Sequence, residues 1–406
     1  MPEPADPYET ARHVTRPHTT DEVSVNAIPA AQRRPHDPDP DTVDAGLLDC
    51  VQANLGVLAD HHHGPGTHLR LGARLRFHCH PGEDGLPTVD PPLDTHLAEA
   101  ERVLGLRVAA RARLTGEGLL DAVRAAGGTH RYVVADAHAL PWLPYHRRAH
   151  MDHSFLLAAG PDGWHVTDAY RNETRWGAAD PGQWTLADSE LAEITTAEVL
   201  DLRPVELPKE PDPAWENGPT EGYLAAYGTC PDRARALHRL TAETWLLTRA
   251  RKLHARYREQ AGLPVDQDHL HRWDAIQEQT YLAHRRVERG RADPPGLLQR
   301  LSEALAADEA AFGGGSATSH GSAVPEPGPA DAALRRSVAA IAASVLGAAE
   351  ADLLDGAAFD TYATFSSFRL VEIIERLEAE LDLELDPDAL VPENLHRVDD
   401  LCRIAR

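Results

Sequence analysis

Three side chains that lie far apart in the sequence have the chemistry of a nucleophile, a general base and an acid that orients the base: Cys50, His153 and Asp168. A thiol attacks a carbonyl carbon as the thiolate, so it needs a base or a favourable electrostatic field beside it. An imidazole can take the thiol proton, and a carboxylate bonded to that imidazole stabilises its protonated form. These residue types predict covalent chemistry at a carbonyl group.

The stretch 150–170, HMDHSFLLAAGPDGWHVTDAY, predicts a β-hairpin that holds the base and the acid. Two mostly apolar runs, 154–159 and 164–167, flank Pro161-Asp162-Gly163, in which Pro and Gly are typical of a tight turn. We expect His153 just before the first strand and Asp168 just after the second. The two side chains would then lie side by side at one end of the hairpin.

Cys50 falls near the start of a predicted helix. Asp41 and Thr42 are candidate caps of this helix. Apolar residues recur in it at helical spacing: Leu47, Leu48, Val51, Leu55, Leu58. The positive end of a helix dipole favours the thiolate, and cysteines placed there have pKa values lowered from about 8.5 to roughly 3.5–7.5. The alternative is a buried, inert cysteine, which is common for this residue type. The hairpin downstream favours the catalytic interpretation.

The segment between helix and hairpin predicts helices at 93–104 and 114–126 and a strand at 131–136 that ends at Asp136. A loop rich in Pro and aromatic residues, 139–145, then leads to His153. We expect Asp136, Trp142 and Tyr145 to bind substrate, with ordinary loop packing as the alternative. A last strand or the start of a linker is expected at 202–207.

No metal is expected, because neither His61-His62-His63 nor His78-Cys79-His80 repeats the spacing of a closed zinc site.

The second half of the chain changes character after a Pro-rich break at 208–219. Helical patterns at 233–259, 269–289 and 295–312 predict a bundle that packs on the preceding domain or shapes an acceptor pocket. Five histidines in it are expected at the surface: His238, His254, His269, His271, His284. Gly, Ser and Pro dominate 313–329, which is the composition of a flexible linker.

The last 76 residues carry one further candidate site, at Ser367. Phe359 lies eight residues before it, and Leu370, Ile374 and Leu377 place one apolar face on the helix that follows. A serine at a helix N-terminus suits a phosphodiester, because the helix dipole favours the negative charge. From Asp331 onward there are 16 acidic residues against 7 arginines and no lysine, a surface suited to basic partners.

Residues 44–205 resemble the N-terminal domain of the butirosin biosynthesis protein H family, and their order of Cys, His and Asp is that of papain-like cysteine proteases. The matching positions are Asp136, Leu140-Pro141-Trp142, His153 and Asp168, together with Cys50 on a helix followed by His63-Gly64. The resemblance implies an α+β papain-like domain. It also implies transfer of an acyl group from a carrier-protein thioester, through Cys50, to an amine. For the oxyanion, Asn54 and backbone amides near Cys50 are the candidate donors.

The C-terminal region is similar to acyl and peptidyl carrier proteins over its whole length. This resemblance implies a four-helix bundle with 4′-phosphopantetheine attached to Ser367. It also implies a phosphopantetheinyl transferase and an adenylation enzyme that activates the acyl or amino acid as partners. Ser366 stands where the family has Asp, and Ala363-Thr364 stand where it has Leu-Gly. Attachment at Ser366, inefficient attachment, and a docking module without the cofactor therefore remain alternatives.

Composition and charge limit the partners and the cell compartment that we expect. The net charge of −24 argues against nucleic acid and anionic membranes as partners, and no apolar run approaches a transmembrane length. The four cysteines are widely spaced, and the N-terminus has no apolar signal segment, so a cytoplasmic protein is expected. We expect five parts: a disordered leader (1–41), a papain-like acyltransferase domain (42–207), a helical domain (208–312), a flexible linker (313–330) and a carrier domain (331–406).

The predicted function is a cysteine-dependent acyltransferase of secondary metabolism that forms an amide with a small-molecule amine. Two alternatives use the same residues differently. One is a thioesterase or peptidase with the same triad. The other is a carrier and docking protein with an inactive papain-like domain.

Overall fold

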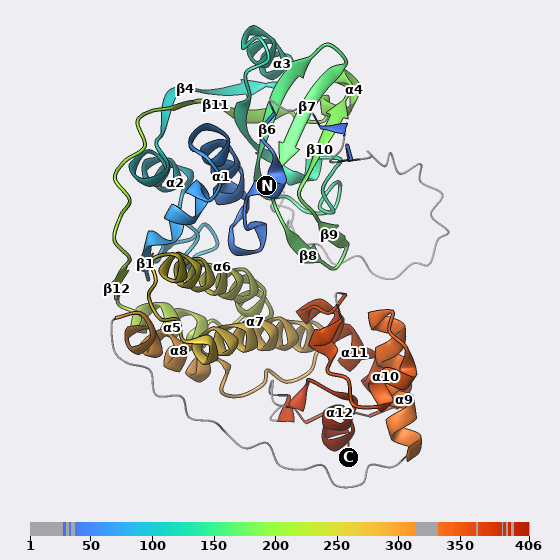
Figure 1. The fold of residues 1–406 in the computed structure, drawn as a ribbon. Helices are drawn as coiled ribbons and strands as arrows, with labels where there is room; N and C mark the ends of the chain where they lie inside the picture. The colour runs from blue at the N-terminus through green and yellow to red at the C-terminus, as the bar shows by residue number, and fades with distance from the viewer. Residues whose placement is uncertain are drawn as a thin grey trace, which may run out of the picture. The chain divides into compact units, whose positions relative to one another are not determined.

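The computed structural model describes residues 27–29, 32–33, 37–313, 332–362, 364–383, 385–386, 389–390 and 394–405. The protein is a mixed α/β multidomain chain that divides into two compact units (Figure 1). The first unit combines Met1–Ala73 with Pro91–Asp212, and the second combines Arg74–Asp90 with Pro213–Arg406. The boundary therefore differs from the expected one, because a segment inside 42–207 belongs to the second unit.

The first unit is built on a six-stranded sheet with the strand order β10-β7-β6-β5-β11-β4, in which every neighbouring pair is antiparallel. Its strands are β4 (Leu106–Thr115), β5 (Arg131–Asp136), β6 (Asp152–Gly160), β7 (Gly163–Asp168), β10 (Gly182–Leu186) and β11 (Thr196–Pro204). A separate two-stranded ribbon pairs β8 (Asn172–Thr174) with β9 (Gly177–Ala179). The helices are α1 (Cys50–His63), α2 (Leu93–Glu99), α3 (Gly116–Ala125) and α4 (Asp188–Leu191), and a π-helical turn (Ala100–Leu104) continues α2.

The hairpin prediction is confirmed, with longer strands than expected. Gly160 pairs with Gly163, so Pro161-Asp162 forms a two-residue turn. Gly163 has φ 135°, a backbone conformation that residues with a side chain rarely adopt. His153 and Asp168 are therefore within β6 and β7 rather than outside them. The strand predicted at 131–136 is confirmed as β5.

The start of α1 corrects one expectation. The helix begins at Cys50 itself and is capped by Asp49, whose carboxylate accepts a hydrogen bond from the Gln52 backbone N–H at 2.7 Å. The Gln52 side chain in turn accepts from the Asp49 N–H at 3.3 Å, which completes a capping box. Asp41 and Thr42 do not cap this helix, because a 3-10 turn and the extended residue Leu48 separate them from it.

Two further expectations for this unit need correction. The described part of the predicted leader is ordered: Arg33 forms ion pairs with Asp39 and Asp41, and the Gln183 side chain donates to the Pro38 carbonyl at 2.9 Å. The last strand, β11, runs from Thr196 to Pro204 and so begins before the predicted 202–207. The helices predicted at 93–104 and 114–126 are confirmed, the second being two residues shorter at its start and one at its end.

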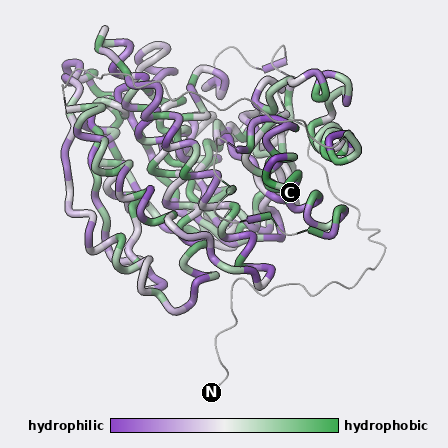
Figure 2. The backbone as a smooth tube through the Cα atoms, turned by 90° about the horizontal axis from the view of Figure 1, so that it is seen from below, coloured by the Kyte–Doolittle hydropathy of each residue, from purple (hydrophilic) through white to green (hydrophobic). Residues whose placement is uncertain are grey.

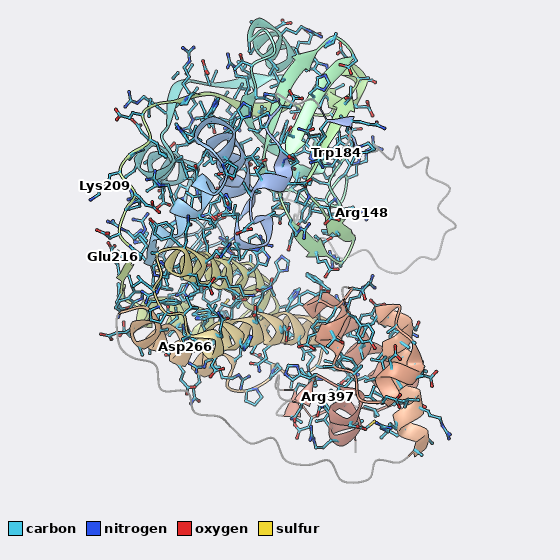
Figure 3. All side chains as sticks on the ribbon, in the orientation of Figure 1. Arg148, Trp184, Lys209, Glu216, Asp266 and Arg397 are labelled. Atoms are coloured by element: carbon cyan, nitrogen blue, oxygen red, sulfur yellow. The ribbon has the colours of Figure 1, made fainter. Side chains whose placement is uncertain are left out.

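The second unit is mainly helical. Its helices are α5 (Glu221–Thr229), α6 (Arg233–Gln260), α7 (Gln267–Glu288), α8 (Leu297–Phe312), α9 (Ala332–Leu346), α10 (Glu350–Leu354), α11 (Ser367–Glu380) and α12 (Val398–Ile404). Figure 2 shows hydrophilic and hydrophobic residues interspersed along the backbone of the described residues. The three long helices predicted in 233–312 are confirmed as α6, α7 and α8. Asp266, labelled in Figure 3, caps α7 by accepting from the His269 N–H at 3.0 Å.

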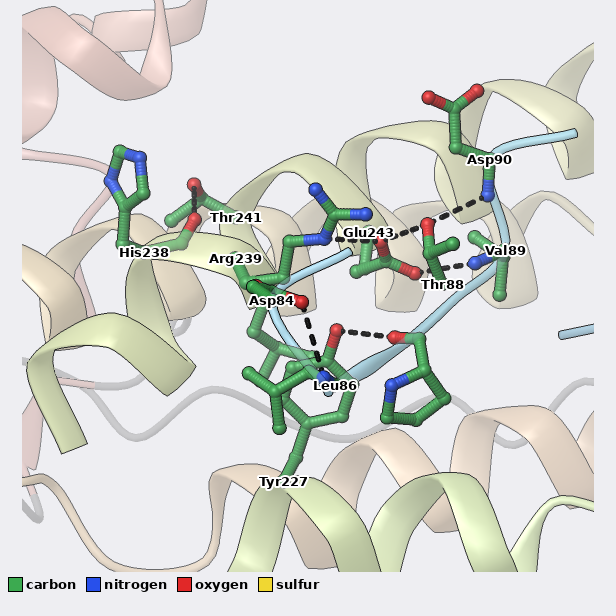
Figure 4. A network of polar contacts seen from close by, with 12 residues as sticks. Asp84, Leu86, Thr88, Val89, Asp90, Tyr227, His238, Arg239, Thr241 and Glu243 are labelled. Carbon is green, nitrogen blue, oxygen red and sulfur yellow. Dashed lines mark hydrogen bonds and ion pairs between the residues drawn. The ribbon is translucent and has the colours of Figure 1, made fainter. Parts of the chain in front are cut away.

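The segment Arg74–Asp90 joins the rest of this unit through one short strand pairing, that of β1, and through a buried carboxylate. Strand β1 (Arg74–Arg76) runs parallel to β12 (Ala214–Glu216), and β2 (His80–Pro81) pairs with β3 (Pro87–Thr88). Glu243 of α6 accepts hydrogen bonds from the Thr88 hydroxyl and the Val89 N–H, both at 2.7 Å, and pairs with Arg239 at 3.2 Å (Figure 4). A fully bonded carboxylate therefore holds this segment on α6.

Three of the five histidines that were expected at the surface of the middle helices are buried, so this expectation is wrong for them. His254 and His269 are 1% exposed and His284 is also buried. His269 bonds to Asp308, and Arg251 pairs with the same carboxylate, so a buried acid and base satisfy each other between α6, α7 and α8.

The helices α9, α10, α11 and α12 surround a common apolar core that also includes Leu282 of α7. Glu375 and Glu378 of α11 each pair with two arginines from α7 and the turn after it: Arg285, Arg289, Arg286, Arg291. Of the predicted linker at 313–330, only Gly313 lies within the described residues. In the part of the chain that the structure describes, none of the helices has the length and apolar character needed to cross a bilayer.

Candidate active site

His153 and Asp168 meet on neighbouring strands of the sheet. Their pairing follows from the register: Leu156 lies opposite Thr167, so Asp168 lies opposite Phe155 and shares a face with it and with His153. The Nε2 atom of His153 is 2.7 Å from Oδ2 of Asp168. Both side chains are buried, at 0% and 2% exposed. The expectation that the hairpin brings these two residues together is confirmed.

The carboxylate of Asp168 has a hydrogen-bond donor on each side. The Tyr170 N–H donates to Oδ1 at 2.9 Å and the Asn54 amide donates to it at 3.2 Å. The Trp142 indole N–H donates to Oδ2 at 3.0 Å, beside His153. Burial, the largest single effect, favours the neutral acid, but the charge and hydrogen bond of His153 together with the bonds from Tyr170 and Trp142 lower the pKa of Asp168. Asp168 is therefore ionised where His153 needs an anionic partner.

Cys50 is the first residue of α1, and the sheet holds this turn in place. The Ser154 hydroxyl donates to the Cys50 carbonyl at 2.7 Å, and the Tyr132 hydroxyl donates to the next carbonyl, that of Val51, at 3.1 Å. Both tyrosine and serine come from the central strands β5 and β6. The helix start that carries the thiol is thus bonded to the residue that follows His153, and Cys50 remains partly exposed.

The second ring nitrogen of His153, Nδ1, differs from the first in its hydrogen bonding. Nδ1 is buried and has no hydrogen-bond partner among the described residues. It is therefore not bonded to the Cys50 thiol in this structure. The structure brings the backbones of the predicted nucleophile and base together through Ser154.

Asn54 is the residue whose role the sequence did not reveal. It is fully buried one turn after Cys50, and its amide nitrogen lies 2.8 Å from the Ser154 carbonyl and 3.2 Å from both the Cys50 carbonyl and Asp168 Oδ1. Its oxygen accepts from the Ala169 N–H at 3.0 Å. Because these groups occupy the amide, Asn54 is not available as an oxyanion donor. A buried Asn in an otherwise apolar stretch, four residues after a candidate nucleophile, was the available signal.

The residues expected to bind substrate have other contacts in the structure. Trp142 bonds to Asp168 and stacks on Trp184 at 6.0 Å between ring centroids. The hydroxyl of Tyr145 is buried beside that of Tyr170 at 3.3 Å. Asp136 caps the turn after β5 and pairs with His150 at 2.6 Å. Their contact with a substrate stays a prediction.

Ser367 is the first residue of α11, as its pattern predicted. The preceding residue, Ser366, is the cap: its hydroxyl accepts from the Arg369 N–H at 3.3 Å. A group attached to Ser367 would therefore join the chain at the positive end of the α11 dipole.

Comparison with known proteins gives no assignment: no protein-family model matches the chain, and no curated protein matches it either. A buried imidazole bonded to an ionised carboxylate, in a strand next to the start of a cysteine-bearing helix, is suited to proton transfer in nucleophilic catalysis.

The lowered pKa of Asp168 predicts a pH dependence of stability. Because the folded state holds this proton more weakly than the unfolded state, the stabilisation is fully present above the unfolded carboxyl pKa of about 4. It is lost as the pH falls through the lower folded pKa. We expect the gap in unfolding free energy between wild type and Asp168→Asn to shrink as the pH is lowered from 6 to 3. This difference in unfolding free energy is measured from the hydrogen exchange of β6 and β7 amides of both proteins in increasing urea. A difference that grows as the pH is lowered would contradict the prediction.

Proposed function

We propose that the protein is a cysteine-dependent acyltransferase that forms an amide bond, with Cys50 as nucleophile, His153 as base and Asp168 as the acid that orients His153. The observation that carries the proposal is the buried His153 ring. One of its nitrogens bonds to an ionised, buried carboxylate, and the other is buried without a hydrogen-bond partner among the described residues. Buried polar atoms are nearly always bonded, and a catalytic role is one of the explanations for an exception.

The first half of the reaction loads the enzyme. His153 Nδ1 takes the proton of the Cys50 thiol when the bound substrate brings the two together, since hydrogen bonds of catalytic groups often tighten only in the complex. The thiolate attacks the thioester carbonyl of the donor. The carbon–sulfur bond to pantetheine breaks, and the pantetheine thiol leaves with the proton from His153. The product is an acyl group on Cys50.

The second half transfers the acyl group. The amine of the acceptor attacks the carbonyl of acyl-Cys50, and its proton passes to His153. The new carbon–nitrogen bond replaces the bond to sulfur, and Cys50 leaves with the proton that His153 returns. No oxidant or nucleotide takes part in this step, since the thioester supplies the driving force.

The C-terminal region supplies the donor in this proposal. Its resemblance to carrier proteins and the place of Ser367 at the first turn of α11 support attachment of 4′-phosphopantetheine there. The composition of 313–330 supports a tether, and a short flexible tether raises the effective concentration of the donor to about the millimolar range. A phosphopantetheinyl transferase would attach the arm, and an adenylation enzyme would supply the acyl or amino acid.

Product analysis tests the function. Acetyl-coenzyme A and a broad phosphopantetheinyl transferase would load the full chain with an acetylated arm, and small primary amines would then be added one at a time. The proposal predicts an acetyl amide that depends on Cys50 and increases with amine concentration. Free acetate formed at the same rate with and without every amine would contradict it and favour the hydrolase. An arm that stays acetylated under all conditions would favour the docking protein.

A further inference from the structure

We infer that Asn54 is a positioning residue that fixes the nucleophile helix against the carboxylate side of the base. This inference rests on the proposed function and extends it to a residue outside the predicted triad. Asn54 contacts no reacting atom. It bonds instead to the backbone of Cys50, the backbone of Ser154, which follows His153, and the side chain of Asp168.

The orientation of the amide is set by its surroundings. On one side lies a single donor, the Ala169 N–H, at 3.0 Å from the Asn54 oxygen. On the other side the Asn54 nitrogen faces only acceptors or a hydroxyl, which are the Cys50 and Ser154 carbonyls, the Ser154 hydroxyl and Asp168 Oδ1. Reversing the amide would place its oxygen against three acceptors. An amide is therefore the side chain that satisfies both sides.

The bond to Asp168 also decides how the carboxylate is used. Oδ1 accepts from Asn54 and from the Tyr170 N–H, which leaves Oδ2 for His153 and Trp142. With donors on both oxygens, the carboxylate plane is fixed and Oδ2 faces the imidazole. Since Asn54 lies one turn after Cys50 on the same helix, its contact with Asp168 also fixes the position of Cys50 along the axis of α1 relative to His153. A misplacement of about 1 Å at such a site can reduce the rate by about 100-fold.

The substitution Asn54→Asp tests the inference with almost no change of shape. The new carboxyl keeps the bond from Ala169 but faces Asp168 and two carbonyls, so it must hold a proton to fit, because two carboxylates that share a site raise one of their pKa values. At acid pH the variant should behave as wild type. Above the pKa of the new carboxyl, repulsion should displace Asp168 and disfavour the thiolate.

The readout is the rate of Cys50 alkylation by iodoacetamide from pH 5 to pH 8, followed by peptide mass spectrometry of the full chain. We expect Asn54→Asp to match wild type near pH 5 and to be slower by roughly tenfold or more at pH 7.5, the effect of a one-unit rise in thiol pKa. The matched control is Gln52→Glu. It adds a carboxylate in the same turn of α1 but keeps the capping box and has no bond to Asp168.

The possible outcomes distinguish a failure of the role inferred for Asn54 from a failure of the proposed function. Equal losses in Asn54→Asp and Gln52→Glu would show an effect of charge alone and overturn the positioning role. A loss that is uniform across pH would show general damage to the fold and also overturn it. If Asn54→Asp does not fold, Asn54→Ala replaces it: with one donor to Asp168 removed, we expect the pH profile of Cys50 alkylation to shift to higher pH. A profile equal to that of wild type would overturn the inference. If Cys50 of the wild type does not react, the proposed function itself fails.

Discussion

Replacing Cys50 with alanine is expected to reduce amide formation by at least about 1,000-fold, because the proposed route has no other nucleophile to accept the acyl group. Loading of the phosphopantetheine arm should be unchanged, since Cys50 and Ser367 belong to different units of the chain. The measurement is amide formed per minute by the acetyl-loaded protein, together with the intact mass before the amine is added.

The chain provides a matched control for this substitution in Cys79, which is partly exposed like Cys50. Burial, and secondly the charge of Glu243, raises the pKa of Cys79, so its thiol is held in the unreactive form. Cys79→Ala should therefore transfer at the wild-type rate. Amide formation that survives in Cys50→Ala would rule out the acyl-Cys50 intermediate.

Replacing Ser367 with alanine is expected to abolish the mass increase of one phosphopantetheine after incubation with coenzyme A and a broad phosphopantetheinyl transferase. The reason is chemical: the hydroxyl at the first position of α11 is the proposed site of the phosphodiester, and alanine has no oxygen to form it. With the arm absent, transfer from the chain's own carrier region should also stop.

The control is Ser366→Ala, one residue earlier. Its hydroxyl caps α11, so this variant should cost about 1 kcal/mol of helix stability but still gain the arm. The reverse result, in which Ser366→Ala loses the mass increase and Ser367→Ala retains it, would move the attachment to Ser366. No mass increase in the wild type would support the docking-module alternative for the C-terminal region.

The parts of the site that the sequence predicted are those set by local signals. Pro161-Asp162-Gly163 encodes the turn, and the turn brings His153 and Asp168 into neighbouring strands. The cap of α1 was misplaced because several acidic residues precede the helix, and only the extended conformation of Leu48 shows that Asp49 is the one in position. Strand β4 was not predicted, although its sequence, LRVAARARLT, alternates apolar residues with arginines at the period of a strand.

Contacts between distant segments could not be predicted from the sequence. Asn54 and Asp168 are 114 residues apart, and Thr88 and Glu243 are 155 apart. Each pair is a buried polar contact, which leaves no periodic signal in either segment. This is why the role of Asn54 and the assignment of Arg74–Asp90 to the second unit emerge only from the fold.

The acyl-Cys50 intermediate is tested most directly by looking for the acyl group on Cys50. The acetyl-loaded full chain would be incubated without an amine, quenched in acid, digested and analysed by mass spectrometry. We expect an acetylated peptide containing Cys50 that disappears when an accepted amine is added before the quench and is absent in His153→Ala. An acetyl group found only on the Ser367 arm, while the amide still forms on addition of amine, would contradict it.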